Sequence, residues 1–295
     1  MAGPESVGWP APAKLNLFLH VCARRADGYH ELQTVFQLLD HGDELDFVPR
    51  GDGAIRRSAG PEAVPPEEDL VVRAARLLQA QAGIRQGVDI RVRKRLPLGG
   101  GLGGGSSDAA TTLVALNALW GAELSTEELA TLGLRLGADV PVFVRGESAF
   151  AEGVGERLQP LALPEQWFLV IAPAVSVSTA EVFTAPELTR DTPRIKIPPL
   201  EFHRCRNDCE PVVRTRYPPV ARALDWLSSH APARLTGTGG CVFAPFAARA
   251  RAEAVLATLP AGWQGFVARG LQRSPLRARL AVERVRKDNW GVAKR

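Results

Sequence analysis

The segment PLGGGLGGGSSDAA, residues 97–110, places six glycines within seven consecutive positions. Such a run costs stability, because glycine loses more conformational freedom on folding than any other residue. It also lets backbone N–H groups approach a ligand closely. An alternating strand is expected just before it, at residues 88–93, and an alanine-rich helix just after it, at 106–120. A strand, a glycine loop and a helix N-terminus together form an anion site, so the segment predicts phosphate binding rather than a flexible linker.

Two common phosphate-binding motifs describe this loop poorly. A P-loop needs a lysine where Gly105 stands. The dinucleotide fingerprint G-x-G-x-x-G does match, with Glu123 about 20 residues further on, but so many glycines make a match nearly unavoidable. The strand at 88–93 also carries charge at every second position, whereas a central parallel strand is apolar throughout. The loop therefore follows an antiparallel type of strand.

The rest of the chain mixes strands and helices without regular alternation, which indicates the α+β class. Strands are expected over residues 13–23, 30–40, 45–48, 54–57, 88–93, 140–150, 167–172, 241–243 and 265–268. Helices are expected over residues 69–82, 106–120, 125–137, 218–229, 247–258 and from 274 onward. Asp69 is an expected N-cap, Ser125 with Glu128 forms a capping box, and the Gly51–Gly53 turn is expected to join two strands of a hairpin. The loop EGVGE at 152–156 is the expected domain boundary.

Composition excludes several classes of protein. Of 295 residues, 45% are apolar and 23% are charged, so disorder, collagen and coiled coil are excluded as global descriptions. No apolar run reaches the ~18–20 residues that span a bilayer, and the N-terminus lacks the basic and apolar regions of a signal peptide. Four cysteines are too few for a disulfide scaffold. We therefore expect a cytoplasmic protein with no membrane contact.

The positive charge is concentrated at the C-terminal end. The formal net charge is +4, and residues 277–295 contain seven Lys or Arg and two acidic residues. The other 276 residues therefore sum to −1. A nearly neutral body is not typical of a nucleic-acid-binding surface, so no nucleic-acid partner is expected and the basic tail is interpreted as a solvated helix face.

Residues 97–110 resemble the phosphate loop of the GHMP kinases. Three further segments narrow the resemblance to the members that phosphorylate a cytidine diphosphate-linked sugar alcohol: PAKLNL at 12–17 with RADGYH at 25–30, LGADVP at 136–141, and LTGTGGC at 235–241. The resemblance runs from about residue 9 to about 280. It implies a two-lobed α+β fold in which each lobe is a mostly antiparallel sheet with helices packed on it. The expected divisions are an ATP-binding lobe (1–155), a substrate lobe (156–284) and a basic tail (285–295).

The resemblance also implies roles for particular residues. Lys14 and Asp139 would be catalytic, the carboxylate accepting the proton of the substrate hydroxyl and the lysine stabilising developing charge. The nucleotide would contact Asp69, Lys94, Pro97, Leu98, Gly99, Gly100, Gly101, Leu102, Gly103, Gly104, Gly105, Ser106 and Ser107. The substrate would contact Asn16, Tyr29, His30, Thr179 and Phe183, which would hold its cytosine. The turn at 237–240 would shape the site from the other lobe.

The residues alone leave simpler interpretations open. Lys14 could be a strand end with a solvated head group, Asp139 and the two serines could be helix caps, and Phe183 could be ordinary core. His203, Cys205 and Cys209 give three ligands where a structural zinc needs four, so no protein-bound metal site is predicted.

The implied small-molecule partners are ATP and the cytidine diphosphate-linked alcohol, with Mg²⁺ as cofactor. The protein is expected to be a monomer or a weak homodimer. Two features depart from the family pattern: Asp69 stands where the family usually has Asn, and the basic tail lies beyond it. The competing hypotheses are a kinase of another small alcohol such as homoserine or mevalonate, a nicotinamide oxidoreductase, and a nucleic-acid-binding protein.

Overall fold

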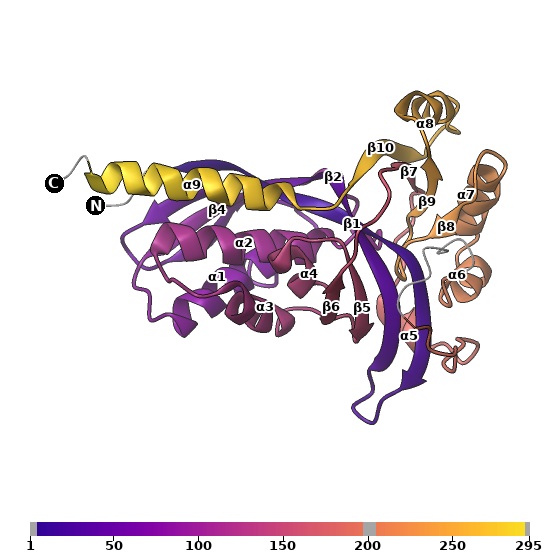
Figure 1. The fold of residues 1–295 in the computed structure, drawn as a ribbon, viewed down its shortest axis with the longest axis horizontal. Coiled ribbons are helices and arrows are strands. Elements are labelled where there is room, and N and C mark those ends of the chain that lie inside the picture. Colours follow the sequence, from indigo (N-terminus) through magenta and orange to yellow (C-terminus); the bar gives the residue numbers. More distant parts are fainter. Residues whose placement is uncertain (1–4, 197–204, 293–295) are drawn as a thin grey trace.

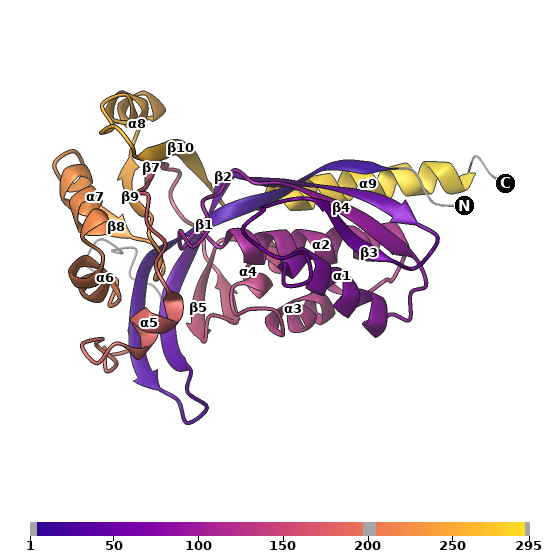
Figure 2. The same ribbon diagram turned by 180° about the vertical axis from the view of Figure 1, so that it is seen from behind.

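The computed structural model describes residues 5–196 and 205–292. Figure 1 shows two lobes joined by long strands, and Figure 2 shows the same arrangement from behind. The strands are β1 (Ser6–Arg24), β2 (His30–Arg50), β3 (Ile55–Ala59), β4 (Gly87–Arg93), β5 (Ala149–Gly153), β6 (Arg157–Pro160), β7 (Trp167–Ala172), β8 (Arg234–Leu235), β9 (Val242–Phe246) and β10 (Gln264–Leu271). The helices are α1 (Leu70–Gln81), α2 (Gly104–Trp120), α3 (Thr126–Leu134), α4 (Val140–Arg145), α5 (Thr179–Thr184), α6 (Glu210–Arg216), α7 (Pro218–Ser228), α8 (Arg249–Leu256) and α9 (Pro275–Val292).

Strands β1 and β2 form the frame on which both lobes are built. They pair antiparallel over nearly their whole length, with several irregularities in register. Trp9 of β1 is buried in the core of the first lobe, whereas Leu19 and Val21 of the same strand are buried in the core of the second. The expectation of separate strands at 30–40 and 45–48 was wrong, because β2 bends through the intervening residues without leaving the sheet.

The sheet continues across the two lobes. Among the described residues its main path is β3-β4-β2-β10-β7-β9-β8, with β1 and β5 also paired to β2. The expected hairpin around Gly51–Gly53 was wrong: β3 does not pair with β2 but runs parallel to β4 at the edge of the sheet. Strand β4 already occupies this side of β2, pairing antiparallel from Glu44 to Arg50. The segment after β2 therefore pairs as β3 with the outer edge of β4 instead of with β2.

The apolar segment at 140–150 was expected to be a strand, and this was wrong for its first half. Residues Val140–Arg145 form α4, and β5 begins only at Ala149. Pro141 lies in the first helical turn, where its missing N–H costs nothing, and Gly146 ends the helix with a φ of 63°. A short apolar run does not by itself distinguish a buried strand from a buried helix.

Helix α9 brings the end of the chain back to the first lobe. Leu276 belongs to the core of that lobe, and Ser6 Oγ donates a hydrogen bond of 3.0 Å to the Glu283 carboxylate. Arg279 pairs with Glu283 at 2.8 Å and stacks over the Trp9 ring at 4.3 Å. Of the expected loop at 152–156, the first two residues end β5 and only 154–156 form the turn to β6; a lobe boundary at this point stays a prediction.

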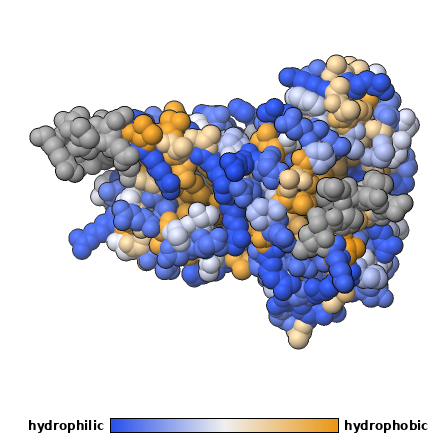
Figure 3. Space-filling view, in the orientation of Figure 1, coloured by the Kyte–Doolittle hydropathy of each residue, from blue (hydrophilic) through white to orange (hydrophobic). Residues whose placement is uncertain are grey.

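The surface in the view of Figure 3 is mostly hydrophilic, with hydrophobic side chains gathered between α9 and the helices beside it. A cavity opens there, lined by residues of α2, α3, α4 and α9 that include Val114, Leu129, Phe143 and Leu280. Within residues 5–196 and 205–292, no helix has the length and apolar composition needed to cross a membrane.

Candidate active site

The glycine loop connects β4 to α2. Gly99, Gly101 and Gly103 have φ values of 68°, 76° and 73°, a region that side chains disfavour, so these positions need glycine. Helix α2 begins at Gly104 with Gly103 as its N-cap and no side-chain capping bond. The serines are therefore not the cap residue: Ser106 lies within the first turn at the cavity, and Ser107 is fully buried with an unpartnered Oγ.

A second glycine turn, residues 237–240, packs directly against the first. Gly240 N donates to Gly99 O at 3.2 Å, and Cys241 N donates to Gly100 O at 3.1 Å. A Cβ on Gly239 would lie 2.1 Å from Gly101 N, and one on Gly101 would lie 2.2 Å from Thr236 O. The two backbones are thus too close for any side chain, and the second lobe fixes the shape of the phosphate loop.

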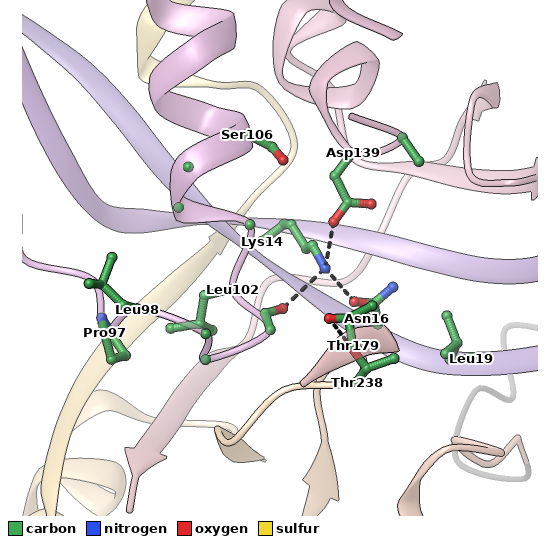
Figure 4. A pocket seen from close by; sticks show the side chains of 18 of the residues that line it. Lys14, Asn16, Leu19, Pro97, Leu98, Leu102, Ser106, Asp139, Thr179 and Thr238 are labelled. Atoms are coloured by element: carbon green, nitrogen blue, oxygen red, sulfur yellow. Dashed lines mark hydrogen bonds and ion pairs between the residues drawn. The ribbon is translucent and has the colours of Figure 1, made fainter. Parts of the chain in front are cut away.

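Lys14 is buried in the middle of β1 and faces the loop. Its side chain is 4% exposed, so its interpretation as a solvated strand end was wrong. Lys14 Nζ donates to Asn16 Oδ1 at 2.6 Å and to the Gly101 carbonyl at 3.1 Å, and it lies 3.2 Å from Asp139 Oδ2 (Figure 4). An ammonium has three N–H donors, and each has an acceptor here. The lysine is therefore held in one orientation.

Asp139 stands immediately before α4 and points into the same space as Lys14 (Figure 4). It occupies the N-cap position but makes no capping hydrogen bond, and its side chain is 33% exposed. The carboxylate is therefore available to a ligand. The cavity beside it has a volume of about 410 Å³ and is lined by the entire segment 97–106, together with Lys14, Asn16, Lys94, Asp139, Thr179, Phe183 and Thr238.

Some residues assigned to the nucleotide lie outside this cavity. Asp69 caps α1 by accepting from Val71 N at 3.1 Å, and its other oxygen pairs with Arg57 at 2.5 Å. The cap is confirmed. Leu70, the next residue, does line the cavity. An adenine contact of Asp69 stays a prediction, as does a nucleotide contact of the buried Ser107.

The residues assigned to the cytosine are divided between the cavity and the β1–β2 hairpin. Phe183 lines the cavity and stacks on His30, with ring centroids 5.1 Å apart and planes 20° apart. Arg190 Nε donates to His30 Nε2 at 3.2 Å, and burial together with the Arg190 charge lowers the pKa of His30. Tyr29 is 63% exposed near the tip of the hairpin and does not line the cavity. Its stacking role stays a prediction.

Lys94 lies between two buried carboxylates that sequence reasoning did not single out. Its Nζ pairs with Asp43 Oδ2 and, at 2.9 Å, with Asp108 Oδ2. Burial, opposed by Lys94 and reinforced by Asp43, raises the pKa of Asp108 to about 7. Asp108 could have been noticed in the sequence as an acidic residue within an alanine-rich helix. Asp43 comes close to Lys94 only because β2 pairs with β4, and no local pattern shows this.

No cluster of three or more His, Cys, Asp or Glu side chains in the described part of the chain could hold a metal ion. His203 lies outside the described residues. Cys209 and Cys241 are buried, and burial raises the pKa of each thiol to about 12. A cation in this site would therefore depend on nucleotide phosphates for part of its coordination.

Comparison with known proteins identifies the class to which this fold and site belong. Residues 69–147 match the model of the GHMP kinases N-terminal domain, and residues 199–265 match the GHMP kinases C-terminal model. A crystal structure of mevalonate kinase covers 92% of this chain with a TM-score of 0.68 at 17% identity, a likeness of fold alone. The chain is a GHMP kinase in fold and in phosphate loop.

Relatives with higher sequence identity show to which family of GHMP kinases the chain belongs. The 4-diphosphocytidyl-2-C-methyl-D-erythritol kinase of Alkalilimnicola ehrlichii is 62% identical over 96% of this chain and 97% of its own, and that of Halorhodospira halophila is 60% identical over 92% and 96%. A crystal structure of 4-(cytidine 5'-diphospho)-2C-methyl-D-erythritol kinase covers 90% of this chain and 99% of its own, with 35% identity and a TM-score of 0.77. The chain belongs to the 4-diphosphocytidyl-2-C-methyl-D-erythritol kinase family.

Proposed function

We propose that this chain transfers the γ-phosphoryl group of ATP to the 2-hydroxyl of 4-diphosphocytidyl-2-C-methyl-D-erythritol, a step of the non-mevalonate isoprenoid pathway. The observation that carries the proposal is the Lys14–Asp139 pair beside the phosphate loop, with 3.2 Å between Nζ and Oδ2. Asp139 accepts the proton of the attacking hydroxyl. Lys14 keeps the carboxylate oriented and offsets negative charge that develops during transfer.

Phosphoryl transfer depends mainly on positioning and charge stabilisation. The glycine loop and the N-terminus of α2 would hold the triphosphate, because unpaired N–H groups and the positive helix end favour an anion. Mg²⁺ would neutralise phosphate charge when it is bound with the nucleotide. The Ser106 hydroxyl and the Asp139 carboxylate are oxygen donors that suit it and that border the cavity.

The acceptor is assigned from the relatives and from the second half of the cavity. Phe183 and Thr179 line the cavity together with the loop, and His30 stacks against the ring of Phe183. A flat, partly polar wall of this kind suits a pyrimidine base. Homoserine and mevalonate offer no ring to it.

The test is a coupled assay of ADP release at fixed Mg-ATP, run in parallel with 4-diphosphocytidyl-2-C-methyl-D-erythritol, homoserine and mevalonate. We expect turnover with the cytidine substrate alone, and phosphorus NMR of the product should place the new phosphate on the 2-hydroxyl. Turnover with homoserine or mevalonate instead would contradict the acceptor and the roles of His30 and Phe183. No ADP release with any of the three would contradict the proposed function.

A further inference from the structure

One buried carboxylate holds both the lysine beside the phosphate loop and the backbone that leads into that loop. Asp43 Oδ2 pairs with Lys94 Nζ, while Asp43 Oδ1 accepts from Arg95 N at 2.6 Å and Leu96 N at 2.9 Å. Its side chain is fully buried. The loop proper begins at Pro97, so Asp43 makes contacts with the three residues that precede it.

The register of the sheet explains this placement. Glu44 of β2 lies opposite Arg93, the last residue of β4, so Asp43 lies opposite the point where the chain leaves the strand. A backbone that leaves a ladder has N–H groups without strand partners, and these need acceptors when they are buried. The Asp43 carboxylate supplies one oxygen to two of them and keeps the other for Lys94.

The charges around Lys94 indicate what its ammonium can do. Asp43 and Asp108 occupy two of its donors, and Lys94 also lines the cavity. A Cβ on Gly104 would lie 3.2 Å from Lys94 Nζ, which places the ammonium at the first turn of α2. The Asp43 carboxylate compensates the charge of the ammonium, and Asp108 accepts a second hydrogen bond from it. The third N–H therefore offers a directed hydrogen bond rather than an uncompensated positive charge. Such a donor suits a neutral acceptor of the nucleoside better than it suits a phosphate.

We infer that Asp43 is a positioning residue for nucleotide binding: it aims the free donor of Lys94 into the cavity and fixes the entry of the phosphate loop. This inference rests on the proposed use of ATP but not on the identity of the acceptor. Asp43 does not border the cavity and touches no reacting atom, so it acts through Lys94 and through the loop backbone.

The chain offers a closely matched control. Asp46 lies three residues further along β2 and is equally buried; it accepts from Gly8 N at 2.9 Å and from Arg93 Nη1 at 2.7 Å. It contacts neither Lys94 nor the loop. Asp43→Asn and Asp46→Asn therefore make the same chemical change at two buried, ion-paired carboxylates of one strand, and only Asp43 contacts Lys94 and the backbone that leads into the loop.

The experiment measures ADP binding by isothermal titration calorimetry and steady-state kinetics with Mg-ATP and the cytidine substrate. We expect Asp43→Asn to weaken ADP binding and raise KM for ATP about tenfold, with kcat and the KM of the cytidine substrate changed by less than about threefold. Asp46→Asn should change ADP binding by less than about twofold. Equal losses in the two variants, or a loss in kcat alone, would overturn the inference.

A double-mutant cycle tests whether Asp43 acts through Lys94. Asp43→Asn and Lys94→Met should be non-additive for ADP binding, because either change removes the same aimed donor. Additive effects would overturn the inference. If the unmodified chain binds no ADP, the proposed function and this inference fail together. If it binds ADP normally but does not phosphorylate the cytidine substrate, only the proposed acceptor fails.

Discussion

At the scale of single residues, the candidate active site is organised by one ammonium group. Lys14 Nζ contacts the side chain of Asn16, the carbonyl of Gly101 and the carboxylate of Asp139, which come from three different elements. A buried ammonium is stable only when its donors are satisfied. These contacts therefore tie the glycine loop and Asp139, the proposed base, to the same strand, and they hold the site in place before any ligand enters.

Replacing the proposed base, Asp139, should separate the effect on catalysis from the effect on nucleotide binding. Asp139→Asn keeps the shape of the side chain but removes the proton acceptor, so we expect kcat to fall about 10³-fold. The affinity for ADP without Mg²⁺ should change by less than about threefold, because the glycine loop does not depend on this carboxylate. Steady-state assays and calorimetry measure the two quantities, with Asp225→Asn, an exposed carboxylate of α7, as control. Full activity of the variant would remove Asp139 from the mechanism.

Asp108 gives the folded chain a pH dependence. Its pKa is raised from 3.8 to about 7, so between pH 4 and 7 the folded state holds a proton that the unfolded state has lost. Stability contributed by this group therefore falls as pH rises through that window. Asp108→Asn removes this proton linkage, so the stability of the variant relative to the unmodified chain should be higher at pH 8 than at pH 5. Urea unfolding at the two pH values measures it; an equal effect at both would contradict the assignment.

At the scale of elements, the helices and strands that could be predicted from the sequence were those marked by a local residue pattern. The capping box at Ser125 and Glu128 is confirmed, with both reciprocal bonds present, and so are strands at 88–93 and 167–172. These elements are specified by neighbouring residues. The pairing of β3 with β4 and the helix at Val140–Arg145 depend on which sheet edge and which core surface are free, and this information lies elsewhere in the chain.

The same distinction applies to the candidate site. The glycine loop, Lys14 and Asp139 lie in short motifs, and the structure brings them together at one cavity. Asp43 lies 51 residues before Lys94 in the sequence and reaches it only through strand register, so no local pattern marks it. The expectation that the turn at 237–240 shapes the site came from the resemblance alone; no local pattern shows that Gly239 packs against Gly101 of the glycine loop.

The contact between the two glycine turns is made by backbone atoms, so adding a single side chain to one of them should disturb it. Gly239→Ala would place a Cβ 2.1 Å from Gly101 N, so one backbone must move. We expect a loss of at least about 2 kcal/mol in the free energy of unfolding and a rise of at least about tenfold in KM for ATP. Gly51→Ala is the control, because a Cβ there has open space around it. Wild-type kinetics and stability in Gly239→Ala would contradict the close approach.

At the scale of the whole molecule, the lobes share strands and a core. A third cluster of buried residues includes Leu15, Leu102, Phe168 and Cys241, and it therefore joins β1 and the glycine loop to β7 and the residue that follows the second glycine turn. Because β1 and β2 run through both lobes, the lobes are not connected by a simple linker. Relative motion of the lobes therefore has to bend or twist these strands, which favours small displacements over a wide hinge opening.

The basic tail should be dispensable for catalysis. Glu283 is the last described buried residue of α9, whereas Val285 is 60% exposed. Deleting residues 285–295 should leave kcat and KM within about twofold of the full chain, and differential scanning calorimetry should show a small change in Tm. A deletion from residue 279, which also removes the contacts of Arg279 and Glu283 with the N-terminal strand, should lower Tm strongly. A large loss of kcat in the shorter deletion would place the tail in the fold or the site.

The return of α9 to β1 has a consequence for how the protein is made. Ser6 and Glu283 are 277 positions apart, yet they are hydrogen-bonded partners, and Arg279 covers Trp9. Strand β1, which contains Trp9, is synthesised first. During translation the surface around Trp9 nevertheless stays exposed on this side until α9 has left the ribosome. The N-terminal lobe is consequently not a unit that matures ahead of the rest of the chain, and a nascent chain stalled before residue 275 carries an apolar surface that chaperones can bind.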